Sequence, residues 1–295
     1  MNQASQTRKT FADKWNNNQE MAFTETLREG SDIHNWILTR NGFADAAALE
    51  DYLRSRVRIL DAGCGNGRVT SLLRRHAAEA AEVMGIDLVA SAIAAQNLAG
   101  VPGVSFAPAD LLEDLSRFGT FDFIYCQEVL HHTADPVQGF ANLCRLLRPG
   151  GEIAIYVYKK KAPVREFVDD YVRERISSLP YEEAREVSRQ ITELGRALSA
   201  TGAKVTVPDV PVLEIKAGEY DVQRFVYHFF MKCFWNPEMT HEDNVGINYD
   251  WYHPQLCSRH TLAEVMGWLR DQGLELRHTH EDFYGVTVRG MRPVR

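Results

Sequence analysis

The sequence lacks the features that mark disulfide-bonded, zinc-binding and membrane-spanning proteins. Its five cysteines are widely spaced and include no CxxC pair, so neither a disulfide framework nor a zinc site is indicated. No run approaches the roughly 20 apolar residues that a membrane helix needs, and the start of the chain has no apolar core of a signal peptide. We therefore expect a cytoplasmic, reduced protein without a metal and without a membrane partner.

Basic residues are scarce relative to acidic ones. The chain of 295 residues has 33 Lys and Arg against 40 Asp and Glu, a formal net charge of -7, and its one dense basic run is residues 159–161. Such a chain repels polyanions overall. The charge balance therefore disfavours a nucleic-acid partner.

Strands and helices alternate between residues 55 and 160. Short apolar segments at 57–63, 82–87, 103–110, 121–128 and 151–159 predict strands, and helical segments separate them. This alternation predicts a parallel sheet covered by helices on both faces. We expect residues 1–55 to form an N-terminal helical cap, and residues 56–159 with 256–295, which add a helix and two strands, to form the core.

The alternation stops at 160–255, which we expect to be an insertion after the fifth strand. Residues 163–176 and 181–200 predict two packed amphipathic helices. The apolar faces expected to be buried are Val164, Phe167, Val168, Tyr171 and Val172 in the first helix, and Ala184, Val187, Ile191, Leu194 and Leu198 in the second. The proline-interrupted segment 204–216 predicts a loop or an edge strand.

Three glycines, Gly63, Gly65 and Gly67, follow the first strand directly. Glycine removes the Cβ and lets a ligand approach the main chain, although the pattern alone is also common in structural turns. Asp87 ends the second strand, where a carboxylate can accept both hydroxyls of a ribose. The glycine spacing departs from the dinucleotide fingerprint G-x-G-x-x-G, which disfavours a dehydrogenase, and the charge of Asp61 favours an ammonium group over a pyrophosphate.

These features fit S-adenosylmethionine, which has an amino acid at one end and a nucleoside at the other. The segments 60–70, 85–93, 107–113, 121–136 and 146–158 together resemble the class I S-adenosylmethionine-dependent methyltransferases, in particular the small-molecule branch of the ubiquinone-biosynthesis type. The resemblance covers about residues 55–158. It implies a Rossmann-like seven-stranded sheet, mostly parallel with an antiparallel final strand, and S-adenosylhomocysteine as the product of the cofactor.

The resemblance implies roles for individual residues of this chain. Asp61 would lie near the amino group of the methionine portion, Asp87 would hold the ribose hydroxyls, and Asp110 would accept the adenine amine. Leu88 would pack on the adenine ring, Leu111 would offer its backbone amide, and Gln127 would face the methionine portion through its backbone. The glycines Gly63, Gly65 and Gly67 would line the methionine and ribose portions.

The acceptor site has to come from outside the shared core. We expect the insertion to form a lid over it, with Trp15 and Trp36 of the N-terminal cap helping to close the site. The aromatic run 225–235 is better explained as a helix packed on the core, whereas 248–254 is expected to be a loop that carries specificity. The substrate-binding candidates are Trp36, Tyr220, Tyr227, His228, Asn248, Tyr249, Trp251 and Tyr252.

His131 and His132 follow the fourth strand, where the reacting methyl group would project. Histidine can act as a general base near neutral pH, but the resemblance implies that this pair mainly shapes the pocket wall. Asp250 and His253 are the other candidate catalytic residues. Because a base is needed only when the acceptor starts protonated, the sequence leaves its use open.

Three functions remain open at this point. The chain could be a small-molecule methyltransferase acting on N, O or S, a tRNA- or protein-modifying methyltransferase, or a non-catalytic subunit that binds S-adenosylmethionine. After the fourth strand the sequence reads QEVL instead of an Asn/Asp-Pro-Pro-Tyr-like motif, which argues against amino-methylation of adenine or glutamine. We expect the first function, and a homodimer is compatible with it.

Overall fold

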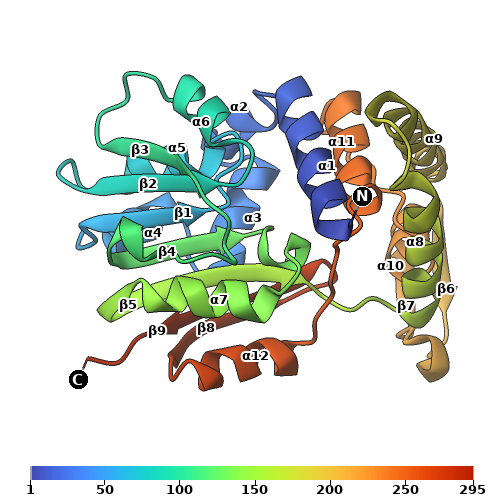
Figure 1. Cartoon of the computed structure of the whole chain (residues 1–295). Helices are drawn as coiled ribbons and strands as arrows, with labels where there is room; N and C mark the ends of the chain where they lie inside the picture. The colour runs from blue at the N-terminus through green and yellow to red at the C-terminus, as the bar shows by residue number, and fades with distance from the viewer. Residues whose placement is uncertain (1, 295) are drawn as a thin grey trace. The chain divides into compact units, whose positions relative to one another are not determined.

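The computed structural model describes residues 2–294, which divide into two compact units (Figure 1). Unit 1 contains the chain up to Thr10 together with Lys160–Cys257. Unit 2 contains Phe11–Lys159 and the chain from Ser258 onward. Helix α1 (Gln3–Asn17) therefore has residues in both units, and each unit combines segments that are far apart in the sequence.

Unit 2 is built on a seven-stranded sheet with the strand order β3-β2-β1-β4-β5-β9-β8. The first five strands pair in parallel, while β9 pairs antiparallel with both β5 and β8. This confirms the predicted Rossmann-like sheet with an antiparallel final strand. The strands are β1 (Arg58–Ala62), β2 (Glu82–Asp87), β3 (Val104–Pro108), β4 (Phe121–Gln127), β5 (Leu147–Tyr158), β8 (Glu275–Glu281) and β9 (Gly285–Met291).

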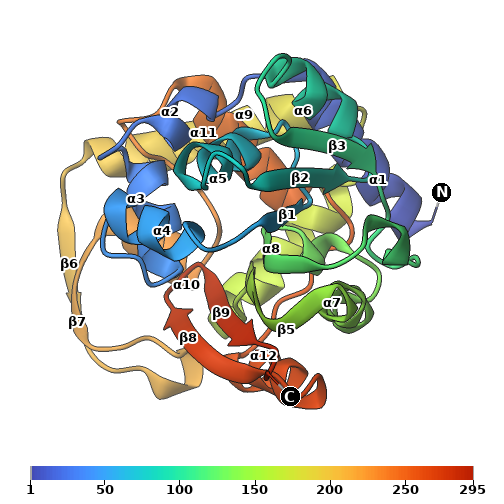
Figure 2. The ribbon, with the colours of Figure 1, turned by 90° about the vertical axis from the view of Figure 1, so that its left-hand side faces the viewer.

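Helices cover both faces of this sheet (Figure 2). Ile59 and Phe123 pack with α3, α4 and α5, whereas Leu60 and Ile124 pack with α7 and α12, because successive strand residues point to opposite faces. The helices of unit 2 are α2 (Phe23–Leu27), α3 (Asp32–Arg40), α4 (Ala46–Leu53), α5 (Arg68–His76), α6 (Ser91–Asn97), α7 (Pro136–Arg145) and α12 (Leu262–Asp271), with 3-10 turns η1 (Ser116–Phe118) and η2 (Leu130–His132).

Unit 1 consists mainly of helices. The two helices predicted at 163–176 and 181–200 are confirmed, and the segment predicted as a loop or edge contains one strand of a two-stranded sheet. The elements are α8 (Pro163–Ile176), α9 (Tyr181–Ala200), β6 (Lys204–Val207), η3 (Pro211–Leu213), β7 (Gly218–Asp221), α10 (Val222–Phe229) and α11 (His241–Tyr252).

The prediction of an apolar buried face on α8 is wrong. Phe167 is 76% exposed, whereas Arg165, Asp169 and Arg173 are buried. The three charged residues are four positions apart and therefore form one stripe along the helix. The stripe is buried because Asp169 accepts hydrogen bonds from Arg165 Nε (3.1 Å) and from Trp251 Nε1 of α11 (2.8 Å).

The apolar face predicted for α9 is partly wrong. Leu194 is 42% exposed, while Ser188, Thr192 and Gly195 are buried. A Cβ at Gly195 would collide with the backbone carbonyl of Cys233. Small residues therefore face the interior because the neighbouring chain runs close to the helix.

The prediction of a loop at 248–254 is also wrong. Its first five residues complete α11, and Asn248, Tyr249 and Trp251 are buried. The Asn248 side chain accepts a hydrogen bond from the Phe234 N–H (2.9 Å) and donates one to the Phe234 carbonyl (3.1 Å). The aromatic residues of this segment are therefore part of the interior of unit 1.

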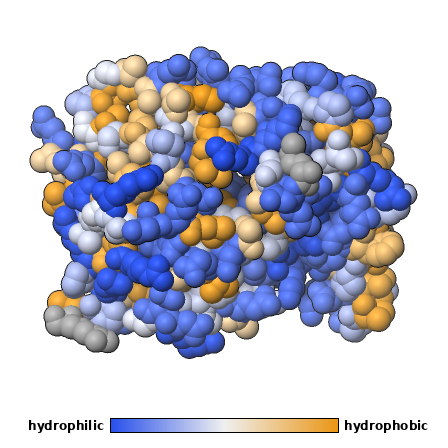
Figure 3. Space-filling view, viewed as in Figure 1, coloured by the Kyte–Doolittle hydropathy of each residue, from blue (hydrophilic) through white to orange (hydrophobic). Residues whose placement is uncertain are grey.

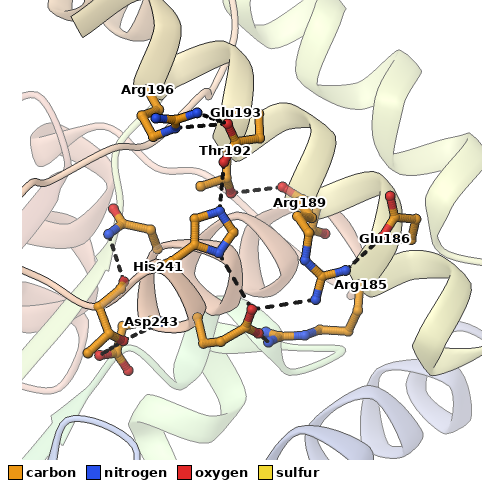
Figure 4. A network of polar contacts seen from close by, with 12 residues as sticks. Arg185, Glu186, Arg189, Thr192, Glu193, Arg196, His241 and Asp243 are labelled. Carbon is orange, nitrogen blue, oxygen red and sulfur yellow. Dashed lines mark hydrogen bonds and ion pairs between the residues drawn. The ribbon is translucent and has the colours of Figure 1, made fainter. Parts of the chain in front are cut away.

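Charged side chains connect α9 with α11 (Figure 4). His241 Nε2 lies 2.8 Å from Glu193, and Glu242 pairs with Arg185 and, at 3.5 Å, with Arg189. Most of these groups are partly exposed, and ion pairs at exposed sites add little to stability. The network therefore orients the two helices more than it stabilises them.

Hydrophilic residues cover most of the face that Figure 3 shows. None of the helices within residues 2–294 is long and apolar enough to cross a bilayer. The same residues contain no group of three or more His, Cys, Asp or Glu side chains that could hold a metal ion.

Candidate functional site

The glycine turn lies between the end of β1 and the start of α5 in unit 2. Gly65 and Gly67 have φ values of +53° and +86°, the left-handed region that glycine adopts without strain. A Cβ at Gly65 would lie 2.7 Å from the Trp15 ring, and one at Gly63 would collide with Val129. The turn therefore presents backbone rather than side chains.

Asp87 connects this turn to the end of β2. Its Oδ2 accepts a hydrogen bond from the Gly65 N–H (3.0 Å), and its Oδ1 accepts from the N–H groups of Val89 and Ala90 (2.8 Å each). A carboxylate offers about four lone-pair positions. Asp87 therefore has capacity left for a ligand hydroxyl while it holds the turn in place.

Asp110 follows β3, the strand that pairs with β2. Its Oδ1 accepts a hydrogen bond from the Leu112 N–H (2.9 Å), which fixes the turn after the strand. Leu111 is buried, and its carbonyl accepts a hydrogen bond from Asn142 Nδ2 (2.8 Å). Leu88, by contrast, is 37% exposed.

Asp61, at the end of β1, is a buried carboxyl group without a cationic partner. It is 3% exposed, and the Thr70 hydroxyl donates to its Oδ2 (2.6 Å). Burial raises the pKa of Asp61 to about 7, although the Thr70 hydrogen bond and the charge of Arg68 act in the opposite direction. No ion pair of Asp61 occurs in the part of the chain that the structure describes.

Arg40, which the sequence analysis missed, is a buried cation without a carboxylate partner. It is 2% exposed, and its Cζ lies 3.4 Å from the Trp36 ring centroid and 4.4 Å from that of Tyr156. Its Nε and Nη1 have no hydrogen-bond partner among residues 2–294. The i,i+4 spacing of Trp36 and Arg40 could have predicted that these two side chains stack. The burial of Arg40 also requires the Tyr156 ring of β5, which the spacing does not predict.

Asp61 and Arg40 belong to the same face of the sheet. Asp61 and Tyr125 are partners across β1 and β4, so their side chains point to one side. Tyr125 pairs with Ala154 of β5, so Tyr156, two residues further along, faces the same side, and Arg40 Cζ lies over its ring. The site thus contains a buried carboxyl group, that of Asp61, and a buried guanidinium group, that of Arg40, which do not pair with each other.

The chain turns sharply after β4. Gln127 exchanges hydrogen bonds with the Asn41 side chain, one of them from Asn41 Nδ2 to Gln127 Oε1 (3.2 Å). Glu128 then has φ +65°, which costs a residue other than glycine about 1–2 kcal/mol. Its Oε2 lies 3.6 Å from Arg68 Nη2. Strained residues of this kind cluster at functional sites.

His131 and His132 lie in η2, directly after this turn. His131 is fully buried, and its ring stacks on that of Tyr158 with 3.7 Å between centroids. His132 is partly exposed and lies 4.8 Å from the Phe11 ring centroid. The pair therefore belongs to an aromatic cluster of unit 2.

The other candidate catalytic residues lie in unit 1. Both ring nitrogens of His253 have partners, Nδ1 at 2.7 Å from Thr10 Oγ1 and Nε2 at 3.1 Å from the Leu179 carbonyl. This is the pattern of a histidine that holds segments together. Asp250 is partly buried on α11.

The substrate-binding candidates are likewise divided. Trp36 lies in unit 2 against Arg40, and the others lie in unit 1. Tyr227, Asn248, Tyr249, Trp251 and Tyr252 are all buried there, and the Tyr220 hydroxyl donates to the Lys216 carbonyl (2.9 Å). Burial and nearby cations, Arg165 first, lower the pKa of His228 to about 3, so this histidine is uncharged near neutral pH.

Comparisons with known proteins converge on one domain. Residues 60–155 match the model of a family described as a methyltransferase domain. An uncharacterised protein of Synechococcus sp. is 41% identical over 118 residues, which are 38% of this chain and 28% of that protein. A ubiquinone biosynthesis O-methyltransferase of Xanthomonas oryzae pv. oryzae is 33% identical over 114 residues, 35% of this chain and 46% of that enzyme. The chain thus spans less than half the length of these relatives.

Solved structures share the fold. Magnesium protoporphyrin IX methyltransferase from Synechocystis PCC 6803 with bound S-adenosylmethionine has a TM-score of 0.51 at 14% identity, over 99% of this chain and 98% of that one. PKMT2 from Rickettsia typhi has a TM-score of 0.53 at 12% identity, over 84% and 52%. Residues 60–155 of this chain are therefore similar to a methyltransferase domain, and the chain shares the fold of these solved structures.

Proposed function

We propose that the protein transfers a methyl group from S-adenosylmethionine to a small-molecule acceptor. The observation that carries the proposal is the presence of buried, mutually unpaired Asp61 and Arg40 on one face of the sheet. The methionine end of the cofactor is a zwitterion. Asp61 would bind its ammonium group and Arg40 its carboxylate, so that both buried charges gain a partner.

The nucleoside end fits the turns after β2 and β3. Asp87 would accept one ribose hydroxyl with the lone pair of Oδ2 that the Gly65, Val89 and Ala90 amides leave. Asp110 would accept the adenine amine, and the exposed Leu88 side chain would cover the adenine ring. These contacts fix the cofactor from the first three strands of the sheet.

The bound cofactor supplies an electrophilic methyl group on a sulfonium. The chain's own task is to align the acceptor with that group and to exclude water. Where the acceptor starts protonated, we assign the general base to His132, because it is partly exposed whereas His131 is fully buried. The name of the Xanthomonas relative, an enzyme of ubiquinone biosynthesis, supports a small-molecule acceptor.

Labelled S-adenosylmethionine distinguishes the candidate functions. The protein is incubated with the label and, separately, with a metabolite extract, total RNA and a protein lysate. We expect label in small molecules, loss of transfer in Asp61→Asn, and full transfer in Asp51→Asn, whose side chain is 69% exposed. Label in RNA or protein alone would contradict the proposal, and cofactor binding without transfer would indicate a non-catalytic subunit.

A further inference from the structure

Asp169 is saturated by hydrogen bonds inside unit 1. Its Oδ1 accepts from the Tyr252 hydroxyl (2.8 Å) and the Lys232 backbone N–H (2.9 Å). Its Oδ2 accepts from Trp251 Nε1 (2.8 Å) and Arg165 Nε (3.1 Å). Because a carboxylate offers about four lone-pair positions, Asp169 has none left for a further donor.

Two cations beside Asp169 keep donors that no other group accepts. Arg165 is 1% exposed, and only its Nε forms a hydrogen bond within residues 2–294, so its two terminal nitrogens have no acceptor there. Lys232 is 6% exposed, and its Nζ makes no hydrogen bond or ion pair in the same part of the chain. None of these nitrogens is among the fully buried polar atoms that lack a partner, so these donors keep some exposed surface.

The two cations converge on one aromatic ring. Lys232 Nζ lies 4.9 Å from the Trp251 ring centroid, and Arg165 Cζ lies 5.2 Å from it. Arg165 Cζ also lies 4.6 Å from the Tyr227 ring centroid. The ring faces hold the cations by cation–π attraction, which is not a hydrogen bond to an oxygen acceptor.

The surroundings of Lys232 contain an excess of buried positive charge. Burial, followed by the charge of Arg165, lowers the pKa of Lys232 to about 7, even though nearby acidic groups favour its charged form. The groups whose charges act on Lys232 are Arg165, Asp250, Asp169 and Cys257. Two further buried cations lie over the same ring, with Lys161 Nζ 5.5 Å and Arg173 Cζ 5.7 Å from the Trp251 ring centroid. A lowered lysine pKa is expected where burial and like charge outweigh nearby acids.

We infer that unit 1 binds an oxyanion, a carboxylate or phosphoryl group of a small molecule, between Arg165 and Lys232. The guanidinium fork suits two parallel hydrogen bonds to such a group, and the ammonium adds a third donor. Asp169 holds the fork in place through Nε. The inference stands without the proposed methyl transfer, because it concerns binding by residues of unit 1 alone.

The test uses the whole protein and two probes, sulfate for a tetrahedral oxyanion and benzoate for a planar carboxylate. Isothermal titration calorimetry at constant ionic strength gives the Kd of each. We expect the wild type to bind at least one probe, and the tighter one identifies the type of oxyanion. Lys232→Met removes the ammonium group but keeps an unbranched side chain, and it should weaken binding about tenfold or more. Lys204→Met, at a lysine that is 65% exposed, should leave the Kd unchanged.

A second readout uses only the wild type. An anion favours the charged ammonium, so binding takes up a proton wherever free Lys232 is neutral. The Kd of sulfate should therefore rise as the pH increases above about 7, by up to about tenfold per unit. The inference is overturned if neither probe binds, if folded Lys232→Met binds like the wild type, or if the Kd does not change with pH. If the variant does not fold, the pH profile decides.

Discussion

Cofactor binding should strengthen as the pH rises toward neutrality, because Asp61 must lose a proton to bind an ammonium group. Burial raises the pKa of Asp61 to about 7, so this carboxyl is protonated in the free protein at mildly acidic pH. The cofactor's amino group has an ordinary pKa of about 7.7–8.0 and stays charged over the same range. The relevant perturbations are therefore the pH itself and the substitution Asp61→Asn.

The magnitude follows from the pKa of Asp61. A bound ammonium favours the ionised carboxylate and lowers that pKa toward its ordinary value near 4. Well below about pH 7, binding then releases close to one proton, and the Kd falls about tenfold for each pH unit gained. The total gain is limited to about 4 kcal/mol, because the pKa can fall by only about three units at 1.36 kcal/mol each.

The same pKa has the opposite effect on the free protein. The folded state holds the proton on Asp61 more tightly than the unfolded state does, so the unfolded state binds fewer protons in this range. The contribution of Asp61 to the free energy of unfolding therefore falls as the pH rises from about 4 to about 7, and it is constant above that.

Calorimetry with S-adenosylhomocysteine, from about pH 5.5 to about 7.5 and in buffers of different ionisation enthalpy, measures both affinity and proton release. Asp61→Asn should bind weakly and without this pH dependence, while Asp51→Asn, at an exposed site, should behave like the wild type. A wild-type Kd that stays constant, or an Asp61→Asn variant that keeps the pH dependence, would refute the reasoning.

Three further substitutions test the same site. Asp87→Ala should weaken cofactor binding by about 1–3 kcal/mol, because a charged acceptor is lost; unchanged affinity by calorimetry would contradict its assignment to the ribose. Arg40→Met should weaken S-adenosylhomocysteine about tenfold or more but leave adenosine unaffected, with the exposed Arg54→Met as control; equal losses for both ligands would place Arg40 elsewhere. Gly65→Ala should lower the free energy of unfolding by at least about 1–2 kcal/mol, because φ is +53° there and the new Cβ would lie 2.7 Å from the Trp15 ring; an unchanged denaturation midpoint would argue against strain.

The core of unit 2 could be predicted because its signals are local. Ile59 and Leu60 lie in a continuous apolar run that ends at Asp61, as a strand buried on both faces requires. The glycine turn is equally local, since the positive φ of Gly65 and Gly67 is a property of the residue itself. The order of strands could be expected only through the family resemblance.

The failures depend on contacts between distant residues. The apolar periodicity of α8 predicts that Phe167 is buried. Instead, Asp169 accepts a hydrogen bond from Trp251, which lies 82 positions further along the chain, and the charged stripe faces the interior. Arg40 was missed for the same reason: a single arginine at the end of a helix predicts a solvated side chain, and the ring that covers it, Tyr156, belongs to β5. A residue's local pattern does not encode such partners.

Unit 1 is formed by two separate stretches of the chain, so it can close only after the second stretch has been synthesised. Gln6 Nε2 donates to the carbonyls of Ser177 (2.8 Å) and His253 (2.9 Å), and the latter lies 247 positions further along. Ribosomes add about 5–20 residues per second, so this early stretch waits roughly 10–50 s for its partner to emerge. Closure of unit 1 is therefore a late event in biogenesis, and an N-terminal fusion that hinders the docking of Gln6 should slow maturation of the nascent protein.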